Sequence, residues 1–289
     1  MLTIFTPTYN RAYLLTRLYD SLCSQTDHSF EWLVVDDGSK DTTKDLIDRF
    51  IREKKINIRY FYQENSGKSA AYNFALKNAK GELFACVDSD DYLSKEAVEN
   101  IFSVWEKAKN NSVGILCKKI TPNGRPITLS RLLDGDFVKL KEIYHKGLLR
   151  GDAFLIFQTS AINKYFFPKF NNEKFVPEAY LFDQICEKSN LYYFDRFLYV
   201  AEYQSDGYTV NMNRLLAENP LGYKAYLDQR ISSEGNVLRK FTYLVRYESI
   251  CFVLNKGYID KSPILFSLMA IFPGWLVYVR RFKKYVRTQ

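Results

Sequence analysis

The sequence predicts an α/β fold in which a mostly parallel, Rossmann-like sheet is covered by helices on both faces. The first 120 residues alternate short apolar runs with amphipathic stretches, which gives the order strand, helix, strand, helix. With 289 residues, 47% of them apolar, the chain can bury a large core. After residue 210 only helical patterns remain, so we expect a main domain at 1–210 and a helical extension at 211–289.

Each of the first four predicted strands ends in a cluster of polar residues. We expect strands at 2–6, 31–36, 57–63 and 83–87. The clusters that follow them are Thr6–Arg11, Asp36–Ser39, Asn65–Ser69 and Asp88–Asp91. Ligands of parallel sheets bind beyond the carboxyl ends of the strands. Because the four clusters would lie at one edge of the sheet, we expect a binding site there.

Two residues mark the expected end of the first strand. Pro7 should stop it, because proline cannot donate a hydrogen bond in a central strand. Asn10 can then cap the helix whose apolar face begins at Leu14.

Three carboxylates, Asp88, Asp90 and Asp91, follow the fourth strand within four residues. Carboxylates at the edge of a core repel one another and are costly to desolvate unless a cation holds them. A divalent ion with oxygen ligands, Mg²⁺ or Mn²⁺, that also carries a substrate diphosphate would explain the pattern. The plainer alternative is a strand that runs into an acidic, solvated turn.

The other clusters also suit a nucleotide. Tyr9 offers a flat face for a base, and Asp36 or Asp37 offers an acceptor for a base or ribose, although both acids are equally typical of caps and turns. Gly67 and Lys68 precede a predicted helix, where backbone amides and an ammonium group suit phosphate. The sequence contains neither a P-loop motif nor a dinucleotide-binding glycine motif.

In order and spacing these motifs resemble those of family 2 glycosyltransferases, which have a GT-A fold. The resemblance covers about the first 120 residues. It is carried by Thr6-Pro7-Thr8-Tyr9-Asn10-Arg11, Val35-Asp36-Asp37-Gly38-Ser39-x-Asp41, Asn65-x-Gly67-Lys68, Asn73 and Asp88-Ser89-Asp90-Asp91. It implies a half that binds a nucleotide-sugar at 1–120 and an acceptor half at 121–210.

The resemblance also implies roles for individual residues in the first half. The nucleoside, usually uridine, would be held by Pro7, Tyr9 and Asp36 or Asp37. Lys68 would lie near the diphosphate or the donor sugar, and Asp88 would approach the ribose. Asp90 would ligate the metal, Mn²⁺ or Mg²⁺, that bridges the diphosphate.

In this family an acidic motif opens a helix late in the fold, and its second acid is the catalytic base. Pro177-Glu178 occupies the equivalent place here, with Glu where Asp is frequent. The resemblance therefore implies Glu178 as the base, with Asp183 as the fallback. The alternative is that Glu178 is an acid favoured by the helix dipole alone. A single base suggests transfer with inversion, although the sequence does not exclude retention.

The expected function is transfer of a sugar from a nucleotide-sugar, usually a UDP-sugar, to a saccharide or lipid-linked saccharide acceptor in cell-surface polysaccharide synthesis. One alternative is a catalytically inactive nucleotide-binding or scaffold protein with the same fold. A nucleotidyltransferase is another, but it would need a glycine-rich, basic loop after the first strand, and Pro7–Asn10 is not one.

The C-terminal segment predicts contact with a membrane surface. Residues 263–279 carry no charge, are too few to span a bilayer and are interrupted by Pro273-Gly274. Basic residues follow at once, beginning with Arg280, so we expect an interfacial anchor at the cytoplasmic face. The alternative is a buried terminal helix. Nucleic acid is not expected, because the basic residues follow an apolar run.

The cysteines indicate the compartment. Five of them are scattered without a Cys-x-x-Cys, which is typical of reduced thiols in the cytoplasm. The first residues lead directly into a strand pattern, with no segment that resembles a secretion signal.

Overall fold

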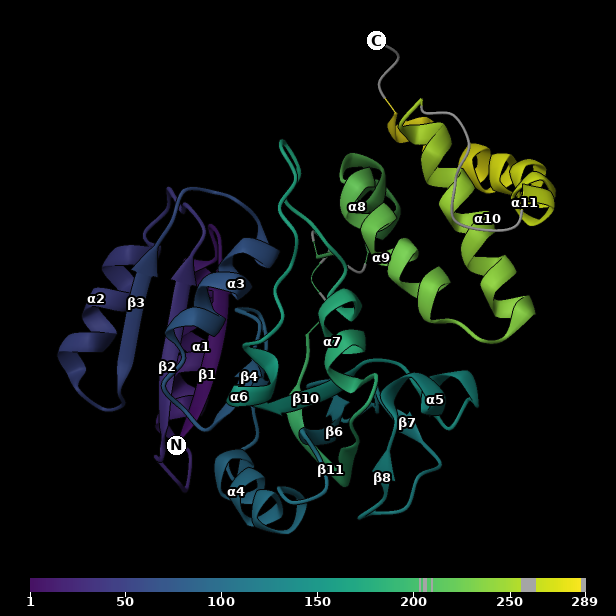
Figure 1. The fold of residues 1–289 in the computed structure, drawn as a ribbon. Helices are drawn as coiled ribbons and strands as arrows, with labels where there is room; N and C mark the ends of the chain where they lie inside the picture. The colour runs from purple at the N-terminus through teal and green to yellow at the C-terminus, as the bar shows by residue number, and fades with distance from the viewer. Residues whose placement is uncertain (203, 205–206, 209, 256–263, 287–289) are drawn as a thin grey trace. The chain divides into compact units, whose positions relative to one another are not determined.

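The computed structural model describes residues 1–202, 204, 207–208, 210–255 and 264–286 (Figure 1). The chain forms two compact units. The first contains residues 1–166 and 181–204, and the second contains residues 167–180 and 205–289. The predicted boundary at residue 210 and the predicted halves of the main domain stay predictions.

The first unit is built on a large mixed sheet whose first half is parallel. Strands β1 (Leu2–Thr8), β2 (Phe30–Asp36), β3 (Ile58–Tyr62) and β4 (Leu83–Cys86) pair in the order β3-β2-β1-β4. The sheet continues with β10 (Ala153–Gln158), β6 (Gly114–Ile120) and β11 (Leu191–Val200). β10 is antiparallel to both of its neighbours, whereas β6 and β11 are parallel to each other. The predicted mostly parallel α/β fold is confirmed.

Short strands complete the sheet edges. β5 (Tyr92–Leu93) and β8 (Phe137–Val138) pair with β11, and β7 (Leu129–Ser130) pairs with β9 (Leu149–Arg150) in a small separate sheet.

Helices cover both faces of this sheet (Figure 1). On one face the apolar sides of α1 (Ala12–Cys23), α2 (Thr43–Glu53) and α4 (Ala97–Ala108) share a core with β1 and β2. On the other face Tyr72 of α3 (Lys68–Asn78) packs on Phe5, with 5.2 Å between ring centroids. Two shorter helices, α5 (Leu140–His145) and α6 (Thr159–Ile162), flank β9 and β10 along the chain.

The expectation that Pro7 ends the first strand was wrong. Strand β1 continues through Pro7 to Thr8. The Asp37 N–H donates to the Thr8 carbonyl on the β2 side, and the Val87 N–H donates to the Phe5 carbonyl on the β4 side. Backbone groups alternate between the two neighbours along a strand, so the Pro7 nitrogen faces the β4 side. The pairing with β4 has already ended at Phe5, and the missing N–H therefore breaks no ladder hydrogen bond.

Asn10 does not cap α1 with its side chain, so that expectation was also wrong. The residue adopts a positive φ of 52°, and its Oδ1 accepts the Lys40 N–H at 2.8 Å. The Ala12 N–H at the start of α1 instead donates to Asp41 Oδ2 at 3.1 Å. The loops that follow β1 and β2 are therefore held together by hydrogen bonds.

The second unit is helical, as predicted for the extension. It contains α8 (Met212–Glu218), α9 (Pro220–Ser233), α10 (Val237–Val253) and α11 (Ile264–Val277), followed by a π-helical turn at Tyr278–Phe282 and a 3₁₀ turn at Lys283–Tyr285. Leu227, Ile250 and Phe282 are among the residues of its buried core. Helix α7 (Ala179–Cys186) has its first two residues in this unit and the rest in the first.

Within the described residues, no helix is long and apolar enough to cross a bilayer.

Candidate active site

The strand register brings the predicted polar clusters together at one edge of the sheet. β1 pairs in parallel with β2 and β4, and all three end within a few residues of one another. The residues that follow them therefore emerge on the same side. The loop after β3 joins them through contacts with Asp37, described next.

Asp36 and Asp37, at the end of β2, are both buried. The two carboxylate oxygens of Asp36 accept the Ser39 N–H at 2.8 Å and the Tyr60 hydroxyl at 2.7 Å. Asp37 holds the loop that follows β3, because its oxygens accept the N–H groups of Ser66 and Gly67 at 2.8 and 2.7 Å. Both acids thus shape the site, and their predicted contact with the nucleoside stays a prediction.

The loop after β3 delivers Lys68. Gly67 adopts a positive φ of 90° directly before α3, a conformation that L side chains rarely adopt. The turn places Lys68 in the first position of the helix, and its Nζ lies 2.6 Å from Asp88 Oδ1. The predicted phosphate-binding lysine and the predicted acidic cluster are therefore in direct contact.

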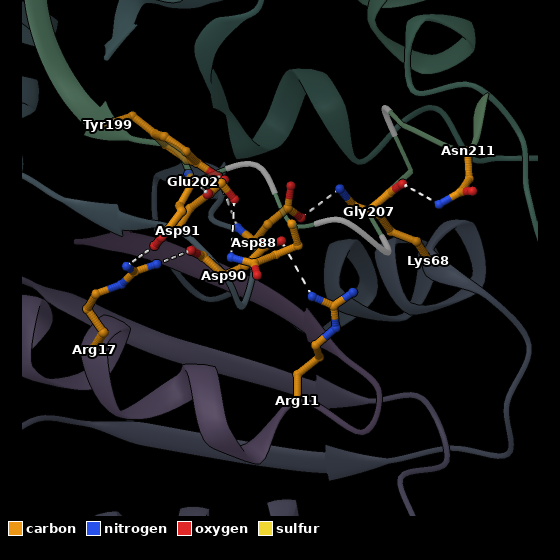
Figure 2. Close-up of polar contacts among 11 residues, drawn as sticks. Arg11, Arg17, Lys68, Asp88, Asp90, Asp91, Tyr199, Glu202, Gly207 and Asn211 are labelled. Carbon is orange, nitrogen blue, oxygen red and sulfur yellow. Dashed lines mark hydrogen bonds and ion pairs between the residues drawn. The ribbon is translucent and has the colours of Figure 1, made fainter. Parts of the chain in front are cut away.

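Asp88 and Asp90 each have a basic partner. Besides Lys68 at Asp88, the Arg11 guanidinium lies 3.6 Å from Asp90 Oδ2 (Figure 2). Burial raises the pKa of Asp88, but the charges of Lys68, Lys119 and Arg11 outweigh it and hold that pKa below its ordinary value. Burial and the neighbouring Asp88 carboxylate raise the pKa of Asp90. The site thus gathers negative and positive groups at close range.

Asp91 points away from this pair and is tied to β11. Its Oδ2 accepts the Tyr199 hydroxyl at 2.6 Å, and its Oδ1 accepts the Glu202 N–H at 2.9 Å (Figure 2). The same Tyr199 hydroxyl accepts the Asp88 N–H at 3.1 Å. Burial, followed by the charge of Asp88, raises the pKa of Asp91 to about 7. Asp91 therefore links the acidic motif to the end of β11.

Arg17 and Lys119, which the sequence reasoning did not single out, also join the cluster, as does Tyr199. Arg17 of α1 contacts the Glu202 carboxylate and the Asp90 carbonyl (Figure 2). Lys119 of β6 lies 4.0 Å from the centre of the Tyr199 ring. Nothing in the sequence connects these residues, since more than 180 positions separate Arg17 from Glu202. Arg11, in contrast, could have been found from the sequence, because it is the last residue of the motif Thr6–Arg11.

The acidic motif suits a divalent cation. Mg²⁺ and Mn²⁺ prefer oxygen ligands, and Mg²⁺ is commonly held by one or two carboxylates while substrate phosphates and water fill the remaining positions. Asp88 and Asp90 supply such a pair, and their mutual repulsion is the penalty that a bound cation removes. No cluster of three or more acidic, His or Cys side chains that could hold a metal occurs among the described residues.

Two further residues with predicted roles, Tyr9 and Glu178, lie on different segments of the chain. Tyr9 directly follows β1 and is 45% exposed. Glu178 is half-buried and directly precedes α7, in the second unit. Its role as base, like the other assigned roles, stays a prediction.

Residues 3–166, more than half of the chain, match the family model described as Glycosyl transferase family 2. The chain belongs to this family. An uncharacterized glycosyltransferase from Rickettsia typhi is 34% identical over 117 residues, which are 40% of this chain and 36% of the relative. The poly(ribitol-phosphate) beta-N-acetylglucosaminyltransferase TarS of Staphylococcus aureus is 30% identical over 126 residues, 43% of this chain and 22% of TarS. The matches thus cover little more than a third, or less, of these relatives.

Solved structures of glycosyltransferases share the fold of the chain. TarS residues 1–349 in complex with UDP-GlcNAc align with a TM-score of 0.60 at 20% identity, over 99% of this chain and 83% of that one. The mannosyltransferase PcManGT from Pyrobaculum calidifontis, in complex with GDP-Man and Mn²⁺, aligns with a TM-score of 0.57 at 14% identity, over 96% and 86%. These likenesses support the GT-A fold of this family 2 chain.

Proposed function

We propose that the protein is a metal-dependent glycosyltransferase that moves a sugar from a UDP-sugar to a saccharide or lipid-linked saccharide acceptor, with inversion. The observation that carries this proposal is the pairing of Asp88 and Asp90 with Lys68 and Arg11 at the carboxyl edge of the sheet. Carboxylates beside basic groups suit a cation and a diphosphate bound together. The family membership supports the reaction class, and the UDP-GlcNAc complex of TarS supports the donor class.

Each group of residues in the donor site would bind a different part of the nucleotide-sugar or the metal ion. Asp90 would hold a Mn²⁺ or Mg²⁺ ion, which when bound neutralises the charge that develops on the leaving diphosphate, and Asp88 would approach the ribose. Lys68 and Arg11 would turn from the carboxylates to the diphosphate oxygens, where basic groups form charge-assisted hydrogen bonds. Tyr9, Pro7 and the loops held by Asp36 and Asp37 would receive the nucleoside.

The transfer step needs a base, because the acceptor hydroxyl has a high pKa and must lose its proton as it attacks. We assign this role to Glu178. Its carboxylate takes the hydroxyl proton, a bond forms between the acceptor oxygen and the anomeric carbon, and the bond from that carbon to the diphosphate breaks. The nucleoside diphosphate leaves from the opposite face of the sugar, so the configuration at the anomeric carbon inverts.

The proposed reaction also suggests an acceptor class and a cellular location. TarS is named for a polymer acceptor, poly(ribitol-phosphate), which supports a large hydroxyl-bearing acceptor. For this chain we propose a saccharide or lipid-linked saccharide acceptor in cell-surface polysaccharide synthesis. Such an acceptor would be met at the inner face of the cytoplasmic membrane.

A panel of nucleotide-sugars with Mn²⁺, read out as release of UDP or GDP, tests the function. We expect release from a UDP-sugar, and we expect Asp90→Ala to lower turnover by a factor of about 1,000, because a metal-held charge stabilises the transition state by several kcal/mol. Asp195→Ala is the matched control, since this carboxylate lies on β11 and pairs with Lys118. Tight UDP binding without release from any donor would instead indicate an inactive nucleotide-binding protein.

A further inference from the structure

Helix α11 is apolar on all sides, although only one of its faces is packed. Ser267, Ala270 and Gly274 are buried. A Cβ added to Gly274 would come within 2.6 Å of Glu248 Cβ on α10, so the two helices meet closely there. Contacts at Phe241–Phe266 and Phe252–Tyr278 show that α10 and α11 run in the same direction. A helix that is apolar all round is normally covered on every side.

The opposite face of α11 is a stripe of exposed apolar side chains. It consists of Leu268, Met269, Phe272, Trp275 and Leu276, and Val279 in the π-helical turn that follows is also exposed. Steps of one, three and four residues keep the five residues of α11 within roughly a third of the helix circumference. Phe272 is 65% exposed, and its ring stacks on Trp275 with centroids 6.2 Å apart. Contiguous exposed apolar surface of this kind marks a contact with a partner or a membrane.

Positive charge borders one end of this stripe. Arg280, Lys283 and Lys284 follow α11 directly and are exposed. Arg281 between them is already engaged, because its Nε donates to Asn213 Oδ1 of α8 at 3.0 Å. The sequence has no acidic residue after Asp260, so nothing on this segment offsets the charge.

We propose that the stripe on α11 docks on an anionic lipid bilayer, with the helix lying in the plane of the interface. The 14 residues of α11 give a length of about 21 Å, which is short of the hydrocarbon thickness. Leu, Phe and Trp side chains on one face, followed by exposed Lys and Arg, match an interfacial helix that enters the headgroup region and pairs with anionic headgroups. A protein partner would not require the basic border. The surface is independent of donor chemistry and goes beyond the proposed transfer reaction.

Fluorescence of the intact protein tests the docking without any variant. Of the three tryptophans, Trp32 and Trp105 are fully buried and Trp275 is 43% exposed. Vesicles of phosphatidylcholine and phosphatidylglycerol in equal parts should therefore shift the Trp275 emission to the blue and protect it from acrylamide. Pure phosphatidylcholine should do so far less, and high salt should weaken the effect.

Variants then locate the surface by vesicle flotation. Phe272→Glu should lower binding to the anionic vesicles by about tenfold or more, and Lys283→Glu with Lys284→Glu should remove most of the dependence on salt. Leu133→Glu is the matched control, because Leu133 is 74% exposed in the first unit. No binding to anionic vesicles, or equal losses in Phe272→Glu and Leu133→Glu, would overturn the proposal. A concentration-dependent dimer that Phe272→Glu abolishes, in the absence of vesicle binding, would assign the stripe to self-association instead.

Discussion

At the scale of single residues, the hydroxyl of Tyr199 has an unusual position. It accepts the Asp88 N–H and donates to the Asp91 carboxylate, so one group fixes both ends of the acidic motif. Burial and the charges of Asp88 and Asp91 raise its pKa well above the ordinary value, which keeps the proton on Tyr199. The motif is thereby held with Asp91 turned toward β11 and with Asp88 and Asp90 turned toward Lys68 and Arg11.

Tyr199→Phe should weaken Mn²⁺-dependent UDP binding about fivefold. The ring still packs, but the Asp88 N–H and one Asp91 oxygen lose their partner, a loss of about 1 kcal/mol. Calorimetric titration of UDP in the presence of Mn²⁺ measures the change. Tyr193→Phe is the control on the same strand, because the Tyr193 hydroxyl donates to Asp195, away from the motif. Equal affinities for the two variants would show that the Tyr199 hydroxyl does not position the site.

At the scale of elements, the loop between β3 and α3 depends on one buried carboxylate. Asp37 accepts the N–H groups of Ser66 and Gly67, and also the side chain of Gln63 at 2.7 Å. Asp37→Ala should therefore lower the free energy of unfolding by about 3 kcal/mol, since hydrogen bonds to charged groups are strong and their donors would stay buried. Denaturant unfolding measures this loss.

The same variant should also weaken UDP binding, because the loop carries Lys68. Asp27→Ala provides the comparison, since Asp27 accepts only the exposed Ser29 N–H among the hydrogen bonds found for its side chain in the described residues. Unchanged stability in Asp37→Ala would refute the anchoring role.

Helices α10 and α11 enclose an acid that is not needed for the proposed reaction. Glu248 of α10 is fully buried, and neither of its oxygens has a hydrogen-bond partner among the described residues. Burial raises the pKa of Glu248 to about 7. An acid with a raised folded-state pKa is protonated in both states at low pH. Stability then falls as pH rises from the unfolded-state pKa, near 4.5, to about 7.

Glu248→Gln should therefore stabilise the protein at pH values above 7 and have little effect near the lower limit of this range. The largest difference is about 3 kcal/mol, at 1.36 kcal/mol for each pKa unit. Denaturant unfolding of both proteins at the two ends of the range gives the comparison. Glu218→Gln is the control, because Glu218 is exposed and pairs with Arg214 on α8. If the stability difference between wild type and Glu248→Gln did not depend on pH, the buried ionisation would be ruled out.

At the scale of the whole molecule, the order of strands and helices could be predicted from the sequence, whereas the contacts between distant side chains could not. Alternating apolar runs follow from local patterning, and they predicted the first four parallel strands and the polar residues at their ends. Pro7 was misread because its tolerance depends on where β4 stops, which is a property of the neighbouring strand. The links from Asp91 to Tyr199 and Glu202 were not predictable, because they join positions more than 100 residues apart.

The boundary between the two units also could not be predicted from local sequence patterns. Residues 167–180 group with the helical unit although they precede β11, and this segment includes Glu178. No local pattern in the sequence indicates such an exchange. Of the polar segment after β11, residues 203, 205, 206 and 209 lie outside the described part of the chain.

Glu178→Gln tests whether Glu178 acts in proton transfer and takes no part in donor binding. All the groups that we assign to the nucleotide and the cation belong to the first unit, whereas Glu178 belongs to the second. The variant should bind UDP and Mn²⁺ with wild-type affinity, because the amide keeps the size of the side chain. Transfer to the acceptor should fall by roughly 100- to 10,000-fold, the usual contribution of a general base. Asp183→Asn is the comparison on α7. If Asp183→Asn loses transfer and Glu178→Gln keeps it, the base is Asp183, more than a turn further along the chain, and the assignment to Glu178 fails.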